Sequence, residues 1–178
     1  MAIDRKKVEE VFQQLGDELY NPTTLCVFGS APAISRGQPA RQTQDIDVWQ
    51  PGSVYDAGDL SRACSRIGIL YDPNGEIDPD AIYIQIVRPG LVALPREFET
   101  ETIGRYGQLT VVMPAPAVLA AVKLVRANEN DVADIVWWIR HSKIRMHQIE
   151  QIIAQLPDHN DREIARENLV IVKLVSGG

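Results

Sequence analysis

One stretch, residues 25–49, constrains most strongly what this chain can fold into. Two aspartates, Asp45 and Asp47, alternate there with Ile46 and Val48. Side chains alternate between the two faces of a β-strand, so this pattern predicts a strand with both carboxylates on one face. Two carboxylates held side by side repel each other unless a cation lies between them. The pattern therefore predicts a metal site at Asp45 and Asp47.

A turn suited to phosphate precedes the aspartates. The apolar run Leu25–Phe28 predicts a buried strand that ends at Gly29 and Ser30. Gly29 has no Cβ, so the backbone can approach a ligand closely there, and Ser30 adds a hydroxyl and an N–H. Mg²⁺ is commonly held by one or two carboxylates together with the phosphates of a substrate. We therefore expect a phosphate at Gly29 and Ser30, and Mg²⁺ or Mn²⁺ at the aspartates.

This combination resembles the motif of the nucleotidyltransferase superfamily: an apolar residue, Gly, Gly or Ser, a spacer, then Asp-apolar-Asp-apolar. Across residues 20–145 the chain is similar to the AbiEii-type and related minimal bacterial nucleotidyltransferases, which occur in toxin–antitoxin and phage-defence systems. The resemblance implies that Asp45 and Asp47 are catalytic metal ligands and that Gly29 and Ser30 bind the nucleotide. The alternative is an acidic loop after a buried strand. Arg36 and Arg41, in the spacer, could reach a nucleotide, although most loop arginines are merely exposed.

A second pair of motifs lies downstream. In AbiEii-type proteins a helix with Lys-Leu precedes a helix with Asp-x-x-Asp, and Lys123-Leu124 and Asp131 to Asp134 match them. The resemblance implies that Lys123 is catalytic and binds the triphosphate, with help from Arg126, and that Asp134 orients Lys123. The alternative is an inter-helix salt bridge with Asp131 as a helix N-cap. Both interpretations stay open for Lys123, and the structural one is favoured for the two aspartates.

A third carboxylate, which the superfamily usually supplies from a later strand, is not evident in this sequence. The strand expected over residues 81–87 carries Gln85 about where an acid would stand. An amide is a poor metal ligand and cannot act as a base. Asp78 and Asp80, just before this strand, are the possible third acids, although a solvated turn explains both more simply. This departure bears on catalysis more than on fold.

The period of the apolar residues predicts an α+β protein, because strands dominate the first part of the chain and helices the last. We expect a small mixed sheet with helices over residues 1–113, followed by a helical lobe over 114–178 packed on it as one compact unit. Residues 91–107 are ambiguous, with room for a short strand. The expected strands span 24–28, 44–49, 81–87 and 109–113, and the expected helices span 4–20, 56–67, 116–127, 131–141, 146–155 and 162–175.

Composition narrows the class of protein. Apolar residues make up 45% and charged residues 24%, values typical of a globular domain, and the net charge of −6 argues against a protein that binds nucleic acid through bulk charge. The only basic cluster, residues 140–147, could touch RNA phosphates, but a solvated face is the simpler explanation. Two cysteines, Cys26 and Cys64, are expected to be reduced and buried. No signal peptide or membrane span is evident, so we expect a cytoplasmic protein.

The sequence thus predicts a protein that binds a nucleoside triphosphate with Mg²⁺ and transfers a nucleoside monophosphate to an acceptor. The acceptor could be RNA, a protein or a small hydroxyl compound. The alternative is a non-catalytic binding protein of the same fold that pairs with a toxin or antitoxin. Whether a third carboxylate approaches Asp45 and Asp47 separates the two.

Overall fold

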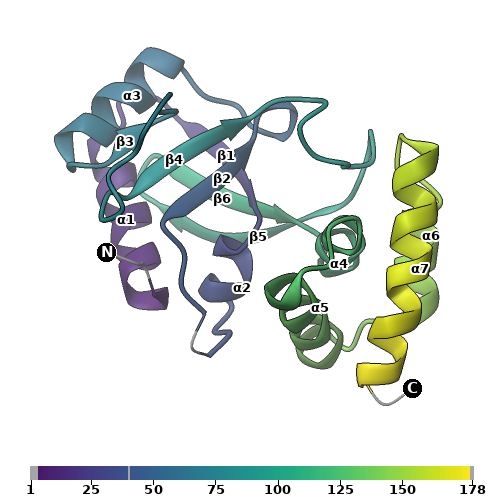
Figure 1. Ribbon diagram of the computed structural model, residues 1–178. Helices are drawn as coiled ribbons and strands as arrows, with labels where there is room; N and C mark the ends of the chain where they lie inside the picture. The colour runs from purple at the N-terminus through teal and green to yellow at the C-terminus, as the bar shows by residue number, and fades with distance from the viewer. Residues whose placement is uncertain (1–3, 40, 177–178) are drawn as a thin grey trace. The chain divides into compact units, whose positions relative to one another are not determined.

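The computed structural model describes residues 4–39 and 41–176. Contacts within the chain define two compact units (Figure 1). The first comprises residues 1–89 and 100–113, and the second comprises residues 90–99 and 114–178. Each unit has its own buried core, so the two are described separately.

The first unit is built on a six-stranded mixed sheet in the order β3-β4-β2-β1-β6-β5. β1 and β2, at its centre, pair antiparallel, whereas β1 pairs parallel with β6, and β4 pairs parallel with both β2 and β3. The strands are β1 (Thr23–Phe28), β2 (Asp45–Trp49), β3 (Leu70–Tyr71), β4 (Tyr83–Val87), β5 (Thr100–Tyr106) and β6 (Leu109–Pro114).

Helices α1 (Arg5–Glu18), α2 (Ala31–Ser35) and α3 (Ala57–Arg66) share one hydrophobic core with the inward side chains of β1, β2, β4 and β6. A 3₁₀ turn, η1 (Gln50–Gly52), follows β2. Ile46 and Val48 lie in this core with no exposed surface. Because side chains alternate along a strand, Asp45 and Asp47 point to the opposite face of the sheet from Ile46 and Val48.

The second unit is helical. α4 packs against each of the other three helices, and Figure 1 shows α7, in yellow, running beside α6. No helix in the described part of the chain is long and apolar enough to cross a membrane. The helices are α4 (Pro116–Leu124), α5 (Glu129–Ser142), α6 (Met146–Ile153) and α7 (His159–Ser176).

The predicted α+β class is confirmed, with strands in the first part of the chain and four helices after β6. Two strands differ from expectation: β3 has only two residues, too few for a periodic pattern, and β5 fills the ambiguous segment. The prediction that Asp131 caps a helix is wrong. Asn128 is the N-cap of α5, because its side chain accepts a hydrogen bond from the Asp131 N–H at 2.9 Å.

Both cysteines are buried free thiols, as predicted. Cys26 lies on β1 and Cys64 on α3. Burial raises the pKa of each thiol to about 12, so both stay protonated near neutral pH. Neither thiol therefore has the low pKa that a reactive cysteine needs.

Gly16 provides a test of how closely α1 packs on β5. Alanine is normally more stable than glycine inside a helix by about 0.5–1 kcal/mol. At position 16, however, a Cβ would overlap the backbone carbonyl of Tyr106, and overpacking of a core costs about 1–3 kcal/mol. We therefore expect Gly16→Ala to lower the free energy of unfolding by about 1 kcal/mol or more, measured by urea denaturation.

Gly58→Ala in α3 is the matched control, because the nearest atom to its new Cβ is a side-chain oxygen of Asp56 at 3.3 Å rather than a backbone atom. This variant should unfold at nearly the wild-type urea concentration. Wild-type stability in Gly16→Ala would contradict the close contact between α1 and β5.

Candidate functional site

Gly29 and Asp47 are in direct contact where β1 ends. The antiparallel register places Phe28 opposite Asp47, so the residue after β1 passes the Asp47 side chain. Gly29 has a φ of +70°, and a Cβ at this position would overlap Oδ2 of Asp47. Glycine adopts the left-handed backbone easily, and because it has no Cβ it does not collide with the Asp47 oxygen. The turn that was predicted to bind phosphate therefore borders the carboxylate that was predicted to bind metal.

Asp45 and Asp47 lie on one face of β2, as the alternation predicted. Both are half-buried, whereas Ile46 between them and Val48 after them have no exposed surface. Oγ1 of Thr43 donates a hydrogen bond to Oδ1 of Asp45 at 2.5 Å. This contact holds the Asp45 carboxylate at the entrance to the strand.

The next strand, β4, brings polar groups beside both carboxylates. Tyr83 is in register with Asp45, and Gln85 is in register with Asp47. Burial raises the pKa of Tyr83, and the negative charges of Asp45 and Asp47 raise it further. The field of both carboxylates thus reaches the phenol, which keeps its proton near neutral pH.

A positive charge from the spacer lies at the glycine turn. A guanidinium nitrogen of Arg41 donates a hydrogen bond to Oγ of Ser30 at 2.7 Å. Sequence reasoning gave Arg41 little weight, because nothing in the spacer's sequence shows where the loop folds back. The contact shows that the loop returns to the turn where a phosphate is expected.

The two carboxylates fit a divalent cation whose coordination is completed by substrate. Among residues 4–39 and 41–176, no group of three or more Asp, Glu, His or Cys side chains lies close enough together to hold a metal. Mg²⁺ nonetheless often binds through only one or two carboxylates plus substrate phosphates. Asp45 and Asp47 would hold the ion, and the missing Cβ of Gly29 lets Oδ2 of Asp47 lie against the turn.

Asp78 and Asp80 lie in an exposed turn before β4. The Asp80 N–H donates to Oδ1 of Asp78 at 2.8 Å, which is a local turn contact. Because the described residues contain no three-acid cluster, the structure does not bring either side chain into one with Asp45 and Asp47.

Gln85 is held by an acid that the sequence analysis did not single out. Its Nε2 donates to Oδ1 of Asp72 at 2.9 Å, and the same carboxylate accepts from the Ile86 N–H at 3.1 Å and from Arg88 at 2.7 Å. Asp72 directly follows β3, which pairs with β4. Residues 72–75 carry turn signals, so the sequence predicts a turn there and gives no sign of a neighbouring strand. A row of side chains from Asp72 through Gln85 to Asp47 thus crosses the sheet.

Lys123, in the second unit, is 7% exposed and paired with two buried carboxylates. Its Nζ lies 2.8 Å from Oδ2 of Asp134 and 3.4 Å from Oδ1 of Asp131. Arg126 makes two further contacts with Asp131, at 2.6 and 2.8 Å. Burial would raise the pKa of Asp131, but the hydrogen bonds and charges of Arg126 and Lys123 together lower it. The predicted salt bridge between the helices is therefore present, and triphosphate binding by Lys123 and Arg126 stays a prediction.

Because this salt bridge is buried, we expect its loss to lower the free energy of unfolding more than the loss of an exposed pair would. The variant Lys123→Met tests this. The variant keeps the aliphatic stem but leaves Asp131 and Asp134 buried without their shared ammonium. Breaking a buried pair from one side costs about 3–5 kcal/mol, against about 0–1 kcal/mol for an exposed pair. We expect a loss of free energy of unfolding in the larger range, measured by urea denaturation at pH 7.

Lys173→Met is the matched control, because Lys173 pairs with Glu150 on the surface at 2.7 Å. It should cost about 1 kcal/mol or less. Equal losses in the two variants would show that the buried cluster contributes no more than a surface ion pair.

A family model described as "Nucleotidyltransferase of unknown function (DUF6036)" matches residues 6–175. No curated protein and no solved structure gives a significant match. The narrower resemblance to AbiEii-type proteins stays a prediction. Because the family model covers nearly the whole chain, the protein belongs to this family of nucleotidyltransferases of unknown function.

Proposed function

We propose that this protein binds a nucleoside triphosphate together with Mg²⁺ or Mn²⁺ and transfers its nucleoside monophosphate to a hydroxyl acceptor. The acceptor is RNA, a protein or a small molecule. The observation that carries the proposal is the contact of Gly29 with Asp47, in which a left-handed glycine borders a carboxylate. This arrangement provides backbone N–H groups for phosphate next to an oxygen ligand for a cation.

Each side chain has a defined part in such a transfer. Asp45 and Asp47 hold the cation, the Ser30 hydroxyl and the turn N–H groups bind the outer phosphates, and Arg41 adds positive charge beside Ser30 at 2.7 Å. When bound, the metal stabilises negative charge on the phosphoryl oxygens and activates the attacking oxygen. The acceptor oxygen forms a bond to the α-phosphorus, the bond from that phosphorus to the bridging oxygen breaks, and pyrophosphate leaves. The hydroxyl proton passes to water.

Lys123 and Arg126 belong to this proposal as contacts of the triphosphate. Their positive charges would offset the charge of the transferring group. To do so, Lys123 would have to give up part of its contact with Asp134, which is 2.8 Å away.

A non-catalytic binding function is the second candidate, and Gln85 favours it. The residue in register with Asp47 is an amide tied to Asp72 at 2.9 Å, so it offers no negative charge to a metal and no base to an acceptor. A protein of this kind would bind nucleotide without turning it over, or would serve as a component of a toxin–antitoxin pair.

Asp47→Asn tests the proposed metal and nucleotide site. The substitution keeps the shape of the side chain but removes the charge that a cation requires. We expect the affinity for a nucleoside triphosphate with Mg²⁺ to fall by about tenfold or more, because ligand charge sets cation affinity. Calorimetric titration with each of the four ribonucleoside triphosphates measures this. Stability should be unchanged or higher, because the substitution relieves carboxylate repulsion.

Asp17→Asn, an exposed position on α1, is the matched control and should bind nucleotide as the wild type does. A wild-type protein that binds no triphosphate in the presence of Mg²⁺ would contradict the proposal. Incubation with α-³²P-labelled triphosphate then separates the two candidate functions. Label transferred to RNA, protein or a small molecule supports catalysis, and binding without transfer supports the second candidate.

A further inference from the structure

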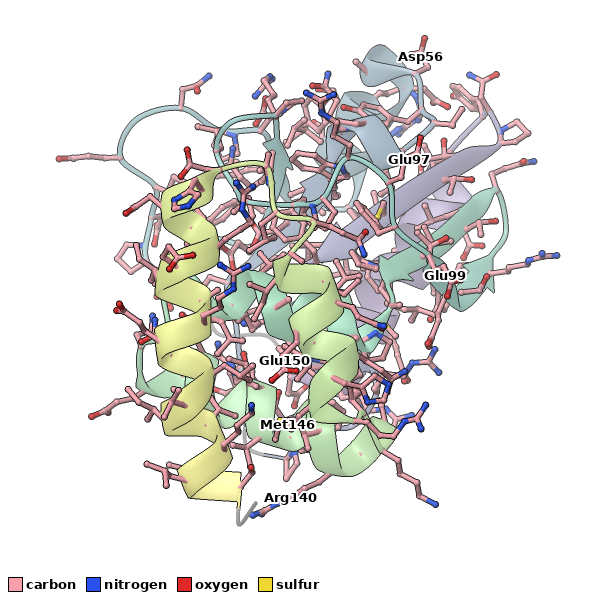
Figure 2. All side chains as sticks on the ribbon, turned by 90° about the vertical axis from the view of Figure 1, so that its right-hand side faces the viewer. Asp56, Glu97, Glu99, Arg140, Met146 and Glu150 are labelled. Atoms are coloured by element: carbon pink, nitrogen blue, oxygen red, sulfur yellow. The ribbon has the colours of Figure 1, made fainter. Side chains whose placement is uncertain are left out.

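A corner of positive charge lies in the second unit, where α5 ends and α6 begins. Between Asp134 and Glu150 the sequence has no acidic residue, although the whole chain carries a net charge of −6. The stretch between them holds three arginines or lysines and two histidines. Figure 2 labels Arg140, near the end of α5, and Met146, at the start of α6, both in the lower part of the view. The basic–aromatic corner, as we name it, comprises Trp137, Arg140, His141, Lys143 and Arg145.

The three cations of this corner are exposed and unpaired. Within residues 4–39 and 41–176, the side chains of Arg140, Lys143 and Arg145 form no ion pair or hydrogen bond. Several other cations of the same unit are engaged, as Lys173 is with Glu150 at 2.7 Å. Three neighbouring positive charges that lack an internal partner are suited to an external anion.

Two of these cations occupy positions where helix physics favours other residues. Lys143, after α5, has a left-handed backbone with a φ of +51°, a conformation that glycine or asparagine adopts most easily. Arg145 is the N-cap of α6, where the helix dipole disfavours positive charge and Ser, Thr, Asp or Asn is preferred. The cap uses only backbone atoms of Arg145: its N–H donates to Oε1 of Gln148 at 2.8 Å, and its carbonyl oxygen accepts from the Gln148 N–H at 2.9 Å. Attraction to the negative C-terminal end of the α5 dipole explains the position of Arg140. It does not explain the position of Arg145, which lies at the start of α6.

An aromatic stack lies beside the charges. The rings of Trp137 and His141 are nearly parallel, with centroids 4.3 Å apart and an interplanar angle of 13°. Trp138, by contrast, is 1% exposed and belongs to the core. His141 is exposed, so the stack ends at the surface, where another flat ring can extend it.

We propose that the basic–aromatic corner binds single-stranded RNA. Phosphates would contact Arg140, Lys143 and Arg145, and an unpaired base would continue the stack of His141 on Trp137. Stacking on aromatic or histidine rings beside basic side chains is the usual way in which proteins hold unpaired RNA bases. An acidic peptide would use the charges but not the ring face, and a duplex offers no unstacked base. The inference does not rest on the proposed nucleotidyl transfer, because it uses none of the residues assigned to nucleotide or metal.

The charge contribution is tested with a triple variant, Arg140→Gln, Lys143→Gln and Arg145→Gln. Fluorescence anisotropy of a labelled, unstructured 12-nucleotide RNA measures the affinity over a series of salt concentrations. Three phosphate contacts predict a slope of log affinity against log salt of about −2, since each contributes about −0.7 for a single strand. The triple variant should lose this slope and most of the binding.

The matched control removes three exposed cations in the first unit, with Lys6→Gln, Arg66→Gln and Arg105→Gln, and has the same net charge. It should bind RNA as the wild type does. Equal binding by the two triple variants would overturn the proposal, as would a wild type that does not bind the RNA at all.

The ring contribution is tested with His141→Ala and His141→Phe. Loss of a stacked base by alanine substitution corresponds to about a 5- to 150-fold weaker affinity, and phenylalanine should restore binding because it keeps the flat face. The salt slope should stay the same in both variants. Undiminished affinity in His141→Ala would remove the stacked base from the proposal.

A single variant keeps the test valid if the triple variant folds poorly. Lys143→Gly removes one charge while it relieves the left-handed backbone, so the melting temperature should rise as RNA affinity falls. Unchanged affinity in this variant would count against the proposal. Stronger binding of single-stranded DNA, an RNA duplex or polyglutamate than of the RNA would overturn the choice of partner.

Discussion

The antiparallel pairing of β1 with β2 is the constraint on which the candidate site depends. This pairing sets Phe28 opposite Asp47, so the chain that leaves β1 must pass the Asp47 carboxylate in contact. Glycine at position 29 permits that approach. A register shift of one residue would turn the aspartates toward the core, where Ile46 and Val48 now lie with no exposed surface. Burying two carboxylates there would cost free energy, so the packing of the core determines which face of the sheet carries the two aspartates.

The two groups of acids in this protein differ in burial and in the residues that neighbour them. Asp131 and Asp134 are fully buried, and Lys123 and Arg126 compensate their charges. Asp45 and Asp47 are only half-buried and are in register with a tyrosine and an amide on β4, and Asp45 accepts a hydrogen bond from the Thr43 hydroxyl. A fully buried, compensated cluster suits a structural role, whereas a partly exposed acidic pair suits the binding of a cation from solution.

The strand of aspartates, the glycine turn and the class of fold could be predicted from sequence, because each depends on a local pattern. The alternation around Ile46 and the apolar run that ends at Gly29 specify their own geometry. The contacts of Asp72 with Gln85 and of Arg41 with Ser30 could not be predicted, since they join residues through a two-residue strand and an irregular loop. The Asn128 cap was missed because Asp131, three residues later, is an equally suitable capping residue type.

The most direct test of the central claim is a crystal structure of the protein with Mn²⁺ and a non-hydrolysable nucleoside triphosphate, with the ion located by anomalous scattering. We predict a manganese peak in contact with carboxylate oxygens of both Asp45 and Asp47, at about 2.0–2.2 Å, with triphosphate oxygens completing its coordination beside the Gly29 turn. A peak elsewhere, or a triphosphate bound away from that turn, would contradict the claim that the contact between Gly29 and Asp47 forms the nucleotide and metal site.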